Sequence, residues 1–551
     1  MEKAKINKSD LIPLYIGITG HRDIRDEDRE PLKLKIKEFI LEKRKQIPFT
    51  PIIILTALAE GADRIAAIAV IECKKELGDN CLVDFIAVLP MPISEYKKDF
   101  VQTKSLLEFD ILYENAISTI ELPFQKDDVT KQHVNNFEIR HEQYYECGLF
   151  IARHCHILVA LWDGIDNEKK GGTADVVKLK ISGIPDSNED HSKKLKHLQT
   201  GPIWHIITPR MNKLVPKNPI TAGYYTIAGE IDPSEVEKKS NDILDHINSY
   251  NKDIDKFYLK IKDKIANSTN SICKEFAELE ENLTIKFIAE KHSTAAELSD
   301  IYQKRRFFAL KVLLSLVVLA FFFLHSNAEF FHEPTILLLY PLTMGIGAIW
   351  YIVAKSSHYE YKHEDYRALA EAYRIQFFLK VCGRKENVTD HYLKRHRGQL
   401  EWVLYVLRSS QIGDLKRDIS STIAENEDVI KRLRLLKSNW VEDQLNYFKD
   451  KAIAHNKSSK RFESIANISF ALAILSACLL FLISYYKEIF PANLKGFEVN
   501  LHSTLSCCTS IFLVLAAALH GYSEKMIFAE QAKNYNQMAQ LFQLASKKLN
   551  Q

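Results

Sequence analysis

The chain has 551 residues, enough for several domains, and its net charge of +3 is nearly balanced. Without a concentrated basic face, this charge argues against a nucleic-acid-binding protein. The 9 cysteines include no CxxC pair, so we expect reduced thiols, no disulfide framework and no metal site. The polar first ten residues predict no signal peptide.

Residues 12–210 alternate short apolar runs with helical segments. This pattern is typical of a Rossmann-like α/β domain with a parallel sheet. The predicted strands cover 15–19, 52–55, 84–89, 156–162 and 202–207. We expect the domain to occupy residues 1–215.

Three glycine-bearing turns follow predicted strands, at 17–20, 59–61 and 171–173. In an open parallel sheet, ligands bind at these carboxyl ends, where helix N-termini offer free N–H groups. Glycine lets the backbone approach a phosphate or a ribose closely. Thr19, Thr56 and Thr173 could add hydroxyl donors, and Arg22 a positive charge. The three turns together predict a site for a nucleotide-type ligand, although glycine in a single turn more often serves chain geometry alone.

Four apolar stretches lie in the C-terminal half, at 307–325, 335–354, 465–485 and 503–521. Each is close to the ~20 residues that cross the hydrocarbon core as a helix. Only Lys311 is charged, and it stands near an end from which it can reach the interface. Lysine and arginine gather outside both pairs of stretches, so the positive-inside rule places the N-terminus, the middle segment and the C-terminus in the cytoplasm.

The two pairs repeat one layout, in which a charged helix leads into a hairpin and an amphipathic helix follows. We therefore expect an all-α membrane region with four transmembrane helices in two hairpins. Its expected parts are a linker with cytosolic helices at 216–305, a first hairpin unit at 306–384, further cytosolic helices at 385–464 and a second hairpin unit at 465–551. Apolar stripes on the cytosolic helices predict packing in a bundle or an oligomer, and recruitment of a partner protein remains open.

The motifs GITGHR (17–22), LAEGAD (58–63) and WDG followed by GGTAD (162–175) resemble the SLOG superfamily. The resemblance implies a Rossmann-like domain that binds a nucleotide-derived ligand, without implying a firm cofactor. LOG-type enzymes of that superfamily also use an upstream arginine, for which Arg140 is the candidate here. The expected ligand-binding residues are Gly17, Thr19, Gly20, His21, Arg22, Thr56, Glu60, Gly61, Asp63, Arg140, Gly171, Gly172 and Thr173.

LOG-type enzymes cleave the N-glycosidic bond of a nucleotide with a glutamate that follows Gly-Thr. This chain has Asp175 at that position, so Asp175 and Arg140 are the candidate catalytic residues. The motif lacks the proline and one glycine of the enzymes, and its carboxylate is shorter. These differences favour a non-catalytic nucleotide sensor, with a membrane-anchored nucleotide N-glycosidase as the alternative.

The membrane half resembles SLATT-type two-span modules through its layout and the helix at 366–379. The resemblance implies a homo-oligomeric effector of bacterial antiviral defence that acts on inner-membrane lipid. We therefore expect a nucleotide-derived second messenger to bind the N-terminal domain and to trigger pore formation or membrane disruption.

Overall fold

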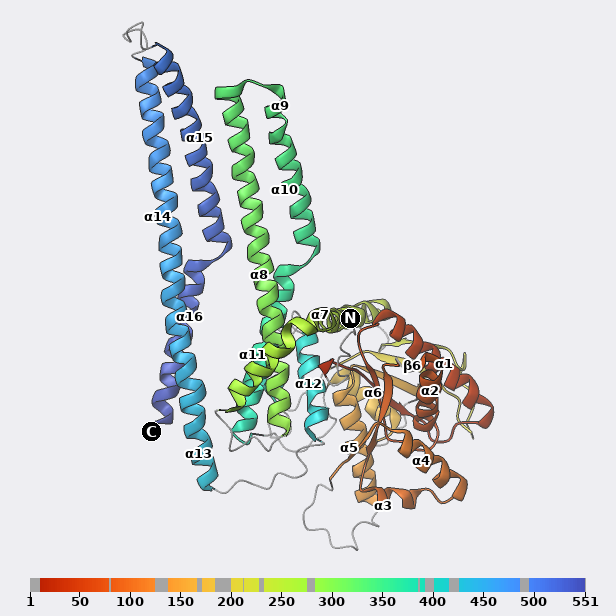
Figure 1. Ribbon diagram of the computed structural model, residues 1–551. Coiled ribbons are helices and arrows are strands. Elements are labelled where there is room, and N and C mark those ends of the chain that lie inside the picture. The colour runs from red at the N-terminus through yellow and green to blue at the C-terminus, as the bar shows by residue number, and fades with distance from the viewer. Residues whose placement is uncertain are drawn as a thin grey trace.

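The structure is a computed structural model that describes residues 10–78, 81–123, 137–165, 171–183, 200–211, 213–226, 232–274, 283–384, 387–391, 401–415, 426–485 and 495–550. An α/β domain forms the N-terminal part, and long helices form the rest (Figure 1).

The N-terminal domain is built on one seven-stranded sheet in the order β4-β3-β2-β1-β5-β6-β7. The strands are β1 (Leu14–Gly20), β2 (Ile52–Thr56), β3 (Val83–Leu89), β4 (Ser118–Glu121), β5 (Ile157–Trp162), β6 (Ile203–Ile207) and β7 (Ala222–Tyr225). Neighbouring strands from β4 to β6 are parallel, and β7 is antiparallel to β6. The α/β fold and all five predicted strands are confirmed, whereas the two edge strands β4 and β7 were not predicted.

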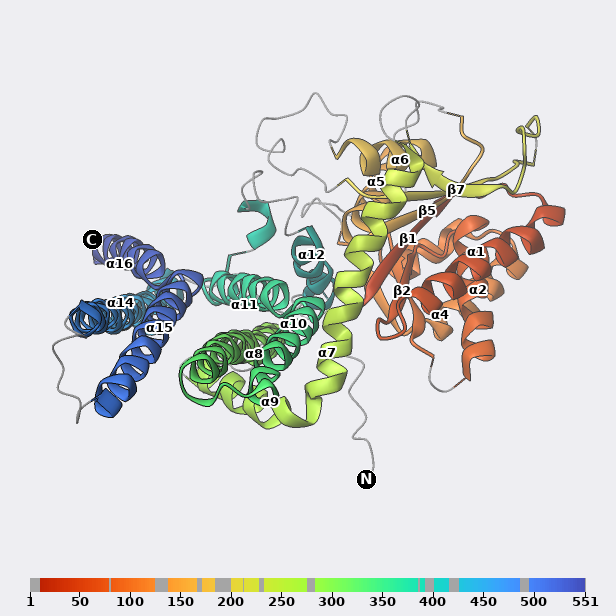
Figure 2. The same cartoon turned by 90° about the horizontal axis from the view of Figure 1, so that it is seen from above.

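Helices cover both faces of the sheet (Figure 2). One face carries α1 (Asp26–Gln46), α2 (Ala62–Leu77) and α4 (Thr103–Asn115), and the other carries α5 (Phe137–His154) and α6 (Thr173–Ser182). The short helices α3 (Ile93–Tyr96) and η3 (Lys97–Asp99) precede α4. Alternate residues of β1 serve the two faces, since Ile16 and Ile18 belong to one hydrophobic core and Tyr15 to the other. Burial on both faces explains why the central strands are continuous apolar runs.

The remaining helices form a bundle beside the α/β domain, from which two hairpins project (Figure 1). In chain order they are α7 (Pro233–Lys274), α8 (Leu283–Ser326), η7 (Asn327–Phe331), α9 (Pro334–Leu337), α10 (Leu339–Ser356), α11 (Tyr359–Val381), η8 (Val388–His391), α12 (Glu401–Leu415), α13 (Asn426–Leu436), η11 (Lys437–Glu442), α14 (Asp443–Tyr485), α15 (Lys495–Lys525) and α16 (Phe528–Leu549). The elements η7 and η11 are π-helical.

The structure has four helical stretches long and apolar enough to cross a membrane. They include α8, α10, α14 and α15, paired as α8 with α10 and α14 with α15 (Figure 1). Between 11% and 22% of each apolar window is buried within the chain, so most of its side chains face outward, as lipid-facing residues do. A multi-pass membrane protein is the consistent interpretation. Both α8 and α14 run without a break from the helical bundle into the hairpin, so no joint separates the two parts.

The two hairpin units share an unusual joint between the second span and the amphipathic helix. His358, with φ 50°, precedes α11, and Ile527, with φ 52°, precedes α16. Aromatic residues then recur at the same seven-residue steps, as Tyr359, Tyr366 and Tyr373 in α11 and as Phe528, Tyr535 and Phe542 in α16. A left-handed residue other than glycine costs about 1–2 kcal/mol, so its recurrence at one place supports duplication of a two-span unit.

Candidate functional site

A cavity of about 270 Å³ lies at the carboxyl ends of β1 and β5. The chain adds β2, β3 and β4 on one side of β1 and then returns to place β5 on the other side. This reversal makes the gap between β1 and β5 the switch point at which open α/β sheets bind ligands. Gly20, His21, Arg22, Asp23, Trp162, Gly171, Gly172, Thr173, Ala174 and Arg210 line the cavity.

The turn after β1 requires glycine at two positions. A Cβ atom on Gly20 would lie 2.4 Å from the Ala62 Cβ and 2.8 Å from the Leu161 carbonyl oxygen. Gly61 has φ 81°, and its Cβ would lie 2.4 Å from the His21 carbonyl oxygen. Both glycines therefore let α2 pack tightly under the turn. This packing fixes the backbone of His21 and Arg22 at the mouth of the cavity.

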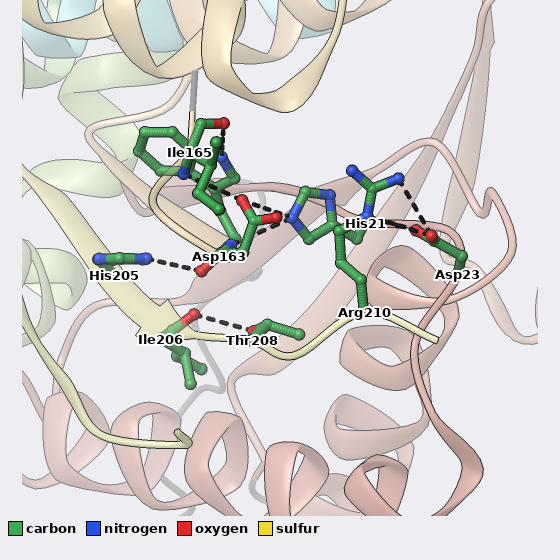
Figure 3. A network of polar contacts seen from close by, with 9 residues as sticks. His21, Asp23, Asp163, Ile165, His205, Ile206, Thr208 and Arg210 are labelled. Atoms are coloured by element: carbon green, nitrogen blue, oxygen red, sulfur yellow. Dashed lines mark hydrogen bonds and ion pairs between the residues drawn. The ribbon is translucent and has the colours of Figure 1, made fainter. Parts of the chain in front are cut away.

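His21 is the centre of a buried polar network at the end of β5 (Figure 3). Its Nε2 lies 3.1 Å from the backbone nitrogen of Asp163 and 3.2 Å from the Asp163 Oδ1. Burial lowers the pKa of His21, although the Asp163 carboxylate acts in the opposite direction. A neutral His21 can accept the Asp163 N–H or donate to the carboxylate, but one nitrogen cannot do both. The same carboxylate accepts the backbone N–H of Ile165, so the loop after β5 is tied to the turn after β1.

Two further strand ends join this network. His205 on β6 lies 2.8 Å, through Nε2, from the Trp162 carbonyl oxygen, and the Thr208 N–H donates to the same oxygen. Burial lowers the pKa of His205, which favours a neutral imidazole that donates this bond. Arg210 pairs with Asp23 at 3.0 Å (Figure 3). The ends of β1, β5 and β6 are therefore cross-linked by polar contacts around one cavity.

Cationic groups stand at the edge of the cavity. Arg22 is exposed, and its guanidinium carbon lies 4.9 Å from the centre of the Tyr144 ring. The Arg210 side chain is 22% exposed and pairs with Asp23, whose side chain is 42% exposed. An exposed pair of this kind contributes little stability and exchanges readily with solvent ions. Both arginines are thus able to meet an anionic ligand.

The start of α6 forms the far wall of the cavity. Gly171 has φ 77°, and Gly172 is the N-cap of the helix. The Asp175 carboxylate accepts a hydrogen bond from the backbone N–H of Gly171 at 2.8 Å. Its negative charge also interacts favourably with the positive end of the α6 dipole. Asp175 would have to release Gly171 before it could act on a substrate.

Several predicted residues lie outside the cavity lining. Gly17 faces α5, since its Cβ would lie 2.7 Å from Ile151, and Thr19 remains within β1. Thr56 donates to the Asp63 carboxylate at 3.0 Å, and both side chains are buried beneath the turn. Burial raises the pKa of Asp63 to about 6, against the effect of the Thr56 hydrogen bond.

Two more predicted residues engage the α3–α4 region. Glu60 accepts a short hydrogen bond from the Ser105 hydroxyl. Arg140 pairs closely with Asp99, which also accepts from the Tyr144 hydroxyl. Tyr144 in turn lies against Arg22. Arg140 is thus connected to the cavity through its neighbours and does not line it.

The sequence prediction missed Asp23, Trp162, Asp163, His205 and Arg210. Trp162 and Asp163 belong to the WDG motif, whose position after a strand was a usable signal. Asp23 and Arg210 are 187 residues apart and meet only because β6 ends beside the turn after β1. No local pattern identifies such a pair.

Helix α7 connects this domain to the hairpins. On the domain side, the Asn251 side chain makes two hydrogen bonds with the backbone of Ile12, at 2.9 and 2.8 Å. On the membrane side, the Asp253 carboxylate accepts from the hydroxyls of Tyr302 on α8 and Tyr366 on α11, at 2.7 and 2.6 Å. Lys362 of α11 completes this buried cluster at 2.7 Å. Asn251 thus binds the backbone just before β1, the strand that ends at the cavity, and Asp253 on the same helix binds the first hairpin unit.

Among the described residues, no group of three or more His, Cys, Asp or Glu side chains could hold a metal ion. Neither a scan against protein-family models nor a search of the curated proteins finds a match for this chain.

Proposed function

We propose that the cavity between β1 and β5 binds an anionic, nucleotide-type ligand and that α7 transmits this binding to the membrane hairpins. The proposal rests on one observation. A cavity with arginines at its edge lies at the switch point of the sheet, and hydrogen bonds of α7 connect this domain to α8 and α11. The SLOG-like motifs supply part of this lining, namely Gly20, His21, Arg22 and the 171–173 turn.

The chemistry of the lining favours a phosphate-bearing ligand. Arg22 and Arg210 are positive, and the α6 N-terminus adds the positive end of a helix dipole. The volume of about 270 Å³ is near the lower end of small-molecule sites, which suits a mononucleotide or one end of a larger nucleotide. Asp23 provides an acceptor suited to a ribose hydroxyl once Arg210 releases it.

Ligand binding can act on the membrane helices through a change in the position of α7. To move a protein from about 1% to about 99% active, a ligand must prefer the active state by about 5.5 kcal/mol. Charge-assisted hydrogen bonds from two arginines and backbone amides can supply a free energy of this order, especially when several copies of the chain respond together. The expected result is rearrangement of the α8–α10 hairpin and, through its contacts with α15, of the second hairpin.

On the resemblance of the motifs and of the hairpin layout, we further propose a homo-oligomeric effector of bacterial antiviral defence. Its hairpins would lie in the inner membrane, with the α/β domain and both termini in the cytoplasm. Pore formation or membrane disruption is the proposed output.

Titration calorimetry on the full chain in detergent tests ligand binding. The probes are adenosine, guanosine, cytidine and uridine monophosphate, with inorganic phosphate measured in parallel. We expect at least one monophosphate to bind more tightly than phosphate and to bind at least tenfold more weakly to Arg210→Ala. The matched control is Arg434→Ala, at an exposed arginine of α13, which should bind as the wild type does. No binding by any probe, or equal binding by both variants, would refute the proposal.

A further inference from the structure

A second cavity, of about 290 Å³, lies within the helical bundle where α11 meets η11 and the start of α14. Its walls come from α7, α8 and α11 on one side and from η11 and α14 on the other. Arg374 and Phe378 lie on α11, whereas Trp440 lies on η11 and Gln444 at the start of α14, the helix that runs on into the second hairpin. The cavity shares no residue with the cavity at the strand ends.

Three polar atoms of this lining are buried without a hydrogen-bond partner. They are the Nε of Arg374, the Nε1 of Trp440 and the Oε1 of Gln444. Gln444 is 5% exposed, and its Nε2 donates to the Asp443 carboxylate at 3.3 Å. With Nε2 engaged by Asp443, Oε1 is the unpaired atom of the amide. Because folded proteins satisfy nearly all buried polar groups, three unpaired atoms around one cavity indicate a missing partner.

The backbone is also unusual at this place. Trp440 belongs to the π-helical segment η11, which leads directly into α14. Such π-helical turns are rare and occur frequently at functional sites. The Trp440 ring stacks on Phe378, with 4.5 Å between centroids and 12° between planes. The stacked rings of Phe378 and Trp440 therefore both contribute to the lining of the cavity.

The unpaired atoms define the chemistry of a complementary ligand. Two donors, from Arg374 and Trp440, require acceptors, and the Gln444 oxygen requires an N–H or O–H donor. The Arg374 guanidinium is already paired with Glu371, and Asp443 is negative, so the site has no excess positive charge for an anion. Burial lowers the pKa of His292, which adds no charge at neutral pH. The aromatic wall favours a planar ring.

We propose that this cavity binds a small, uncharged, planar ligand with a lactam or imide group, which joins α11 of the first hairpin unit to η11 and α14, the elements that lead into the second. The three unpaired atoms are shielded from the cavity, so the Arg374, Trp440 and Gln444 side chains rotate slightly to form hydrogen bonds with a ligand that enters it. The site is independent of the proposed nucleotide cavity.

Uracil is a suitable probe, because its ring carries two carbonyl acceptors and N–H donors. Binding is measured by titration calorimetry and by saturation-transfer NMR on the full chain in detergent. We expect saturable binding with one site per chain. Trp440→Phe retains an aromatic ring but removes the unpaired donor, and it should weaken binding at least tenfold. Arg210→Ala, at the strand-end cavity, should leave uracil binding unchanged.

A comparison made on the ligand does not depend on the folding of any variant. In 1,3-dimethyluracil both N–H donors are methylated, so it should bind the wild-type chain at least tenfold more weakly than uracil. The inference is overturned if uracil shows no saturable binding or if the dimethyl compound binds equally well. It is also overturned if Arg210→Ala, rather than Trp440→Phe, abolishes uracil binding, which would assign the base to the strand-end cavity.

Discussion

Replacement of Asp253 by alanine removes the acceptor that holds α7 against the first hairpin unit. The Tyr302 and Tyr366 hydroxyls and the Lys362 amine all donate to this carboxylate at 2.6–2.7 Å. Burial, together with the nearby carboxylate, raises the pKa of both tyrosines, so both hydroxyls remain protonated donors. In the variant these hydroxyls stay buried without an acceptor, whereas Lys362 is 24% exposed and can reach water. The expected loss is about 3 kcal/mol, the lower end of the range for removing one partner of a buried ion pair.

Hydrogen exchange on the full chain in detergent measures this loss where it occurs. A loss of about 3 kcal/mol corresponds to roughly a hundredfold increase in the opening of α7. Asp255→Ala is the matched control, because Asp255 is an exposed residue of the same helix. A change at such a surface position is expected to stay within about 0.5 kcal/mol. Equal protection of α7 in the two variants would show that Asp253 does not hold the helix in place.

Two further predictions concern the turn beneath the cavity. Because burial raises the pKa of Asp63 from 3.8 to about 6, the folded state binds this proton more tightly than the unfolded state does. The contribution of Asp63 to the free energy of unfolding therefore falls as the pH rises from about 4 to about 7. Over this range, thermal unfolding should show that the wild type loses up to about 3 kcal/mol of stability relative to Asp63→Asn. Parallel pH profiles of the two proteins would contradict this. Gly61→Ala should lower the melting temperature much more than Gly78→Ala. Both glycines have positive φ, but a Cβ at Gly61 would lie 2.4 Å from a backbone oxygen, whereas a Cβ at Gly78 would meet open space. Equal shifts of the melting temperature would refute the clash.

The central strands and the membrane spans were predictable because each is a continuous apolar run with its own length scale. The edge strands β4 and β7 are shorter and carry polar or small residues, such as Ser118, Glu121 and Gly223, so no run marks them. The continuity of α8 was also hidden. A charged segment before Arg306 suggests a boundary between two elements, whereas α8 runs through this position as one helix from Leu283 to Ser326.

The candidate site was predictable where one turn supplies several neighbouring residues, as in the sequence from Gly20 to Arg22. It was not predictable where packing decides which side chains turn inward. Thr56 and Asp63 satisfy each other below the turn, and this pairing depends on how α2 meets β2. The contacts made by α7 were not predictable for the same reason, because Asn251 and Asp253 look like solvent-facing residues between apolar positions until their distant partners are known.

Dye release from liposomes that contain the full chain tests the coupling most directly. The trigger is whichever nucleoside monophosphate binds in calorimetry, and wild type is compared with Arg210→Ala and Asp253→Ala. We expect release from wild-type liposomes, none from Arg210→Ala because the ligand does not bind, and none from Asp253→Ala although the ligand still binds. Nucleotide binding to the wild-type chain without release, or equal release from Asp253→Ala, would contradict transmission through α7.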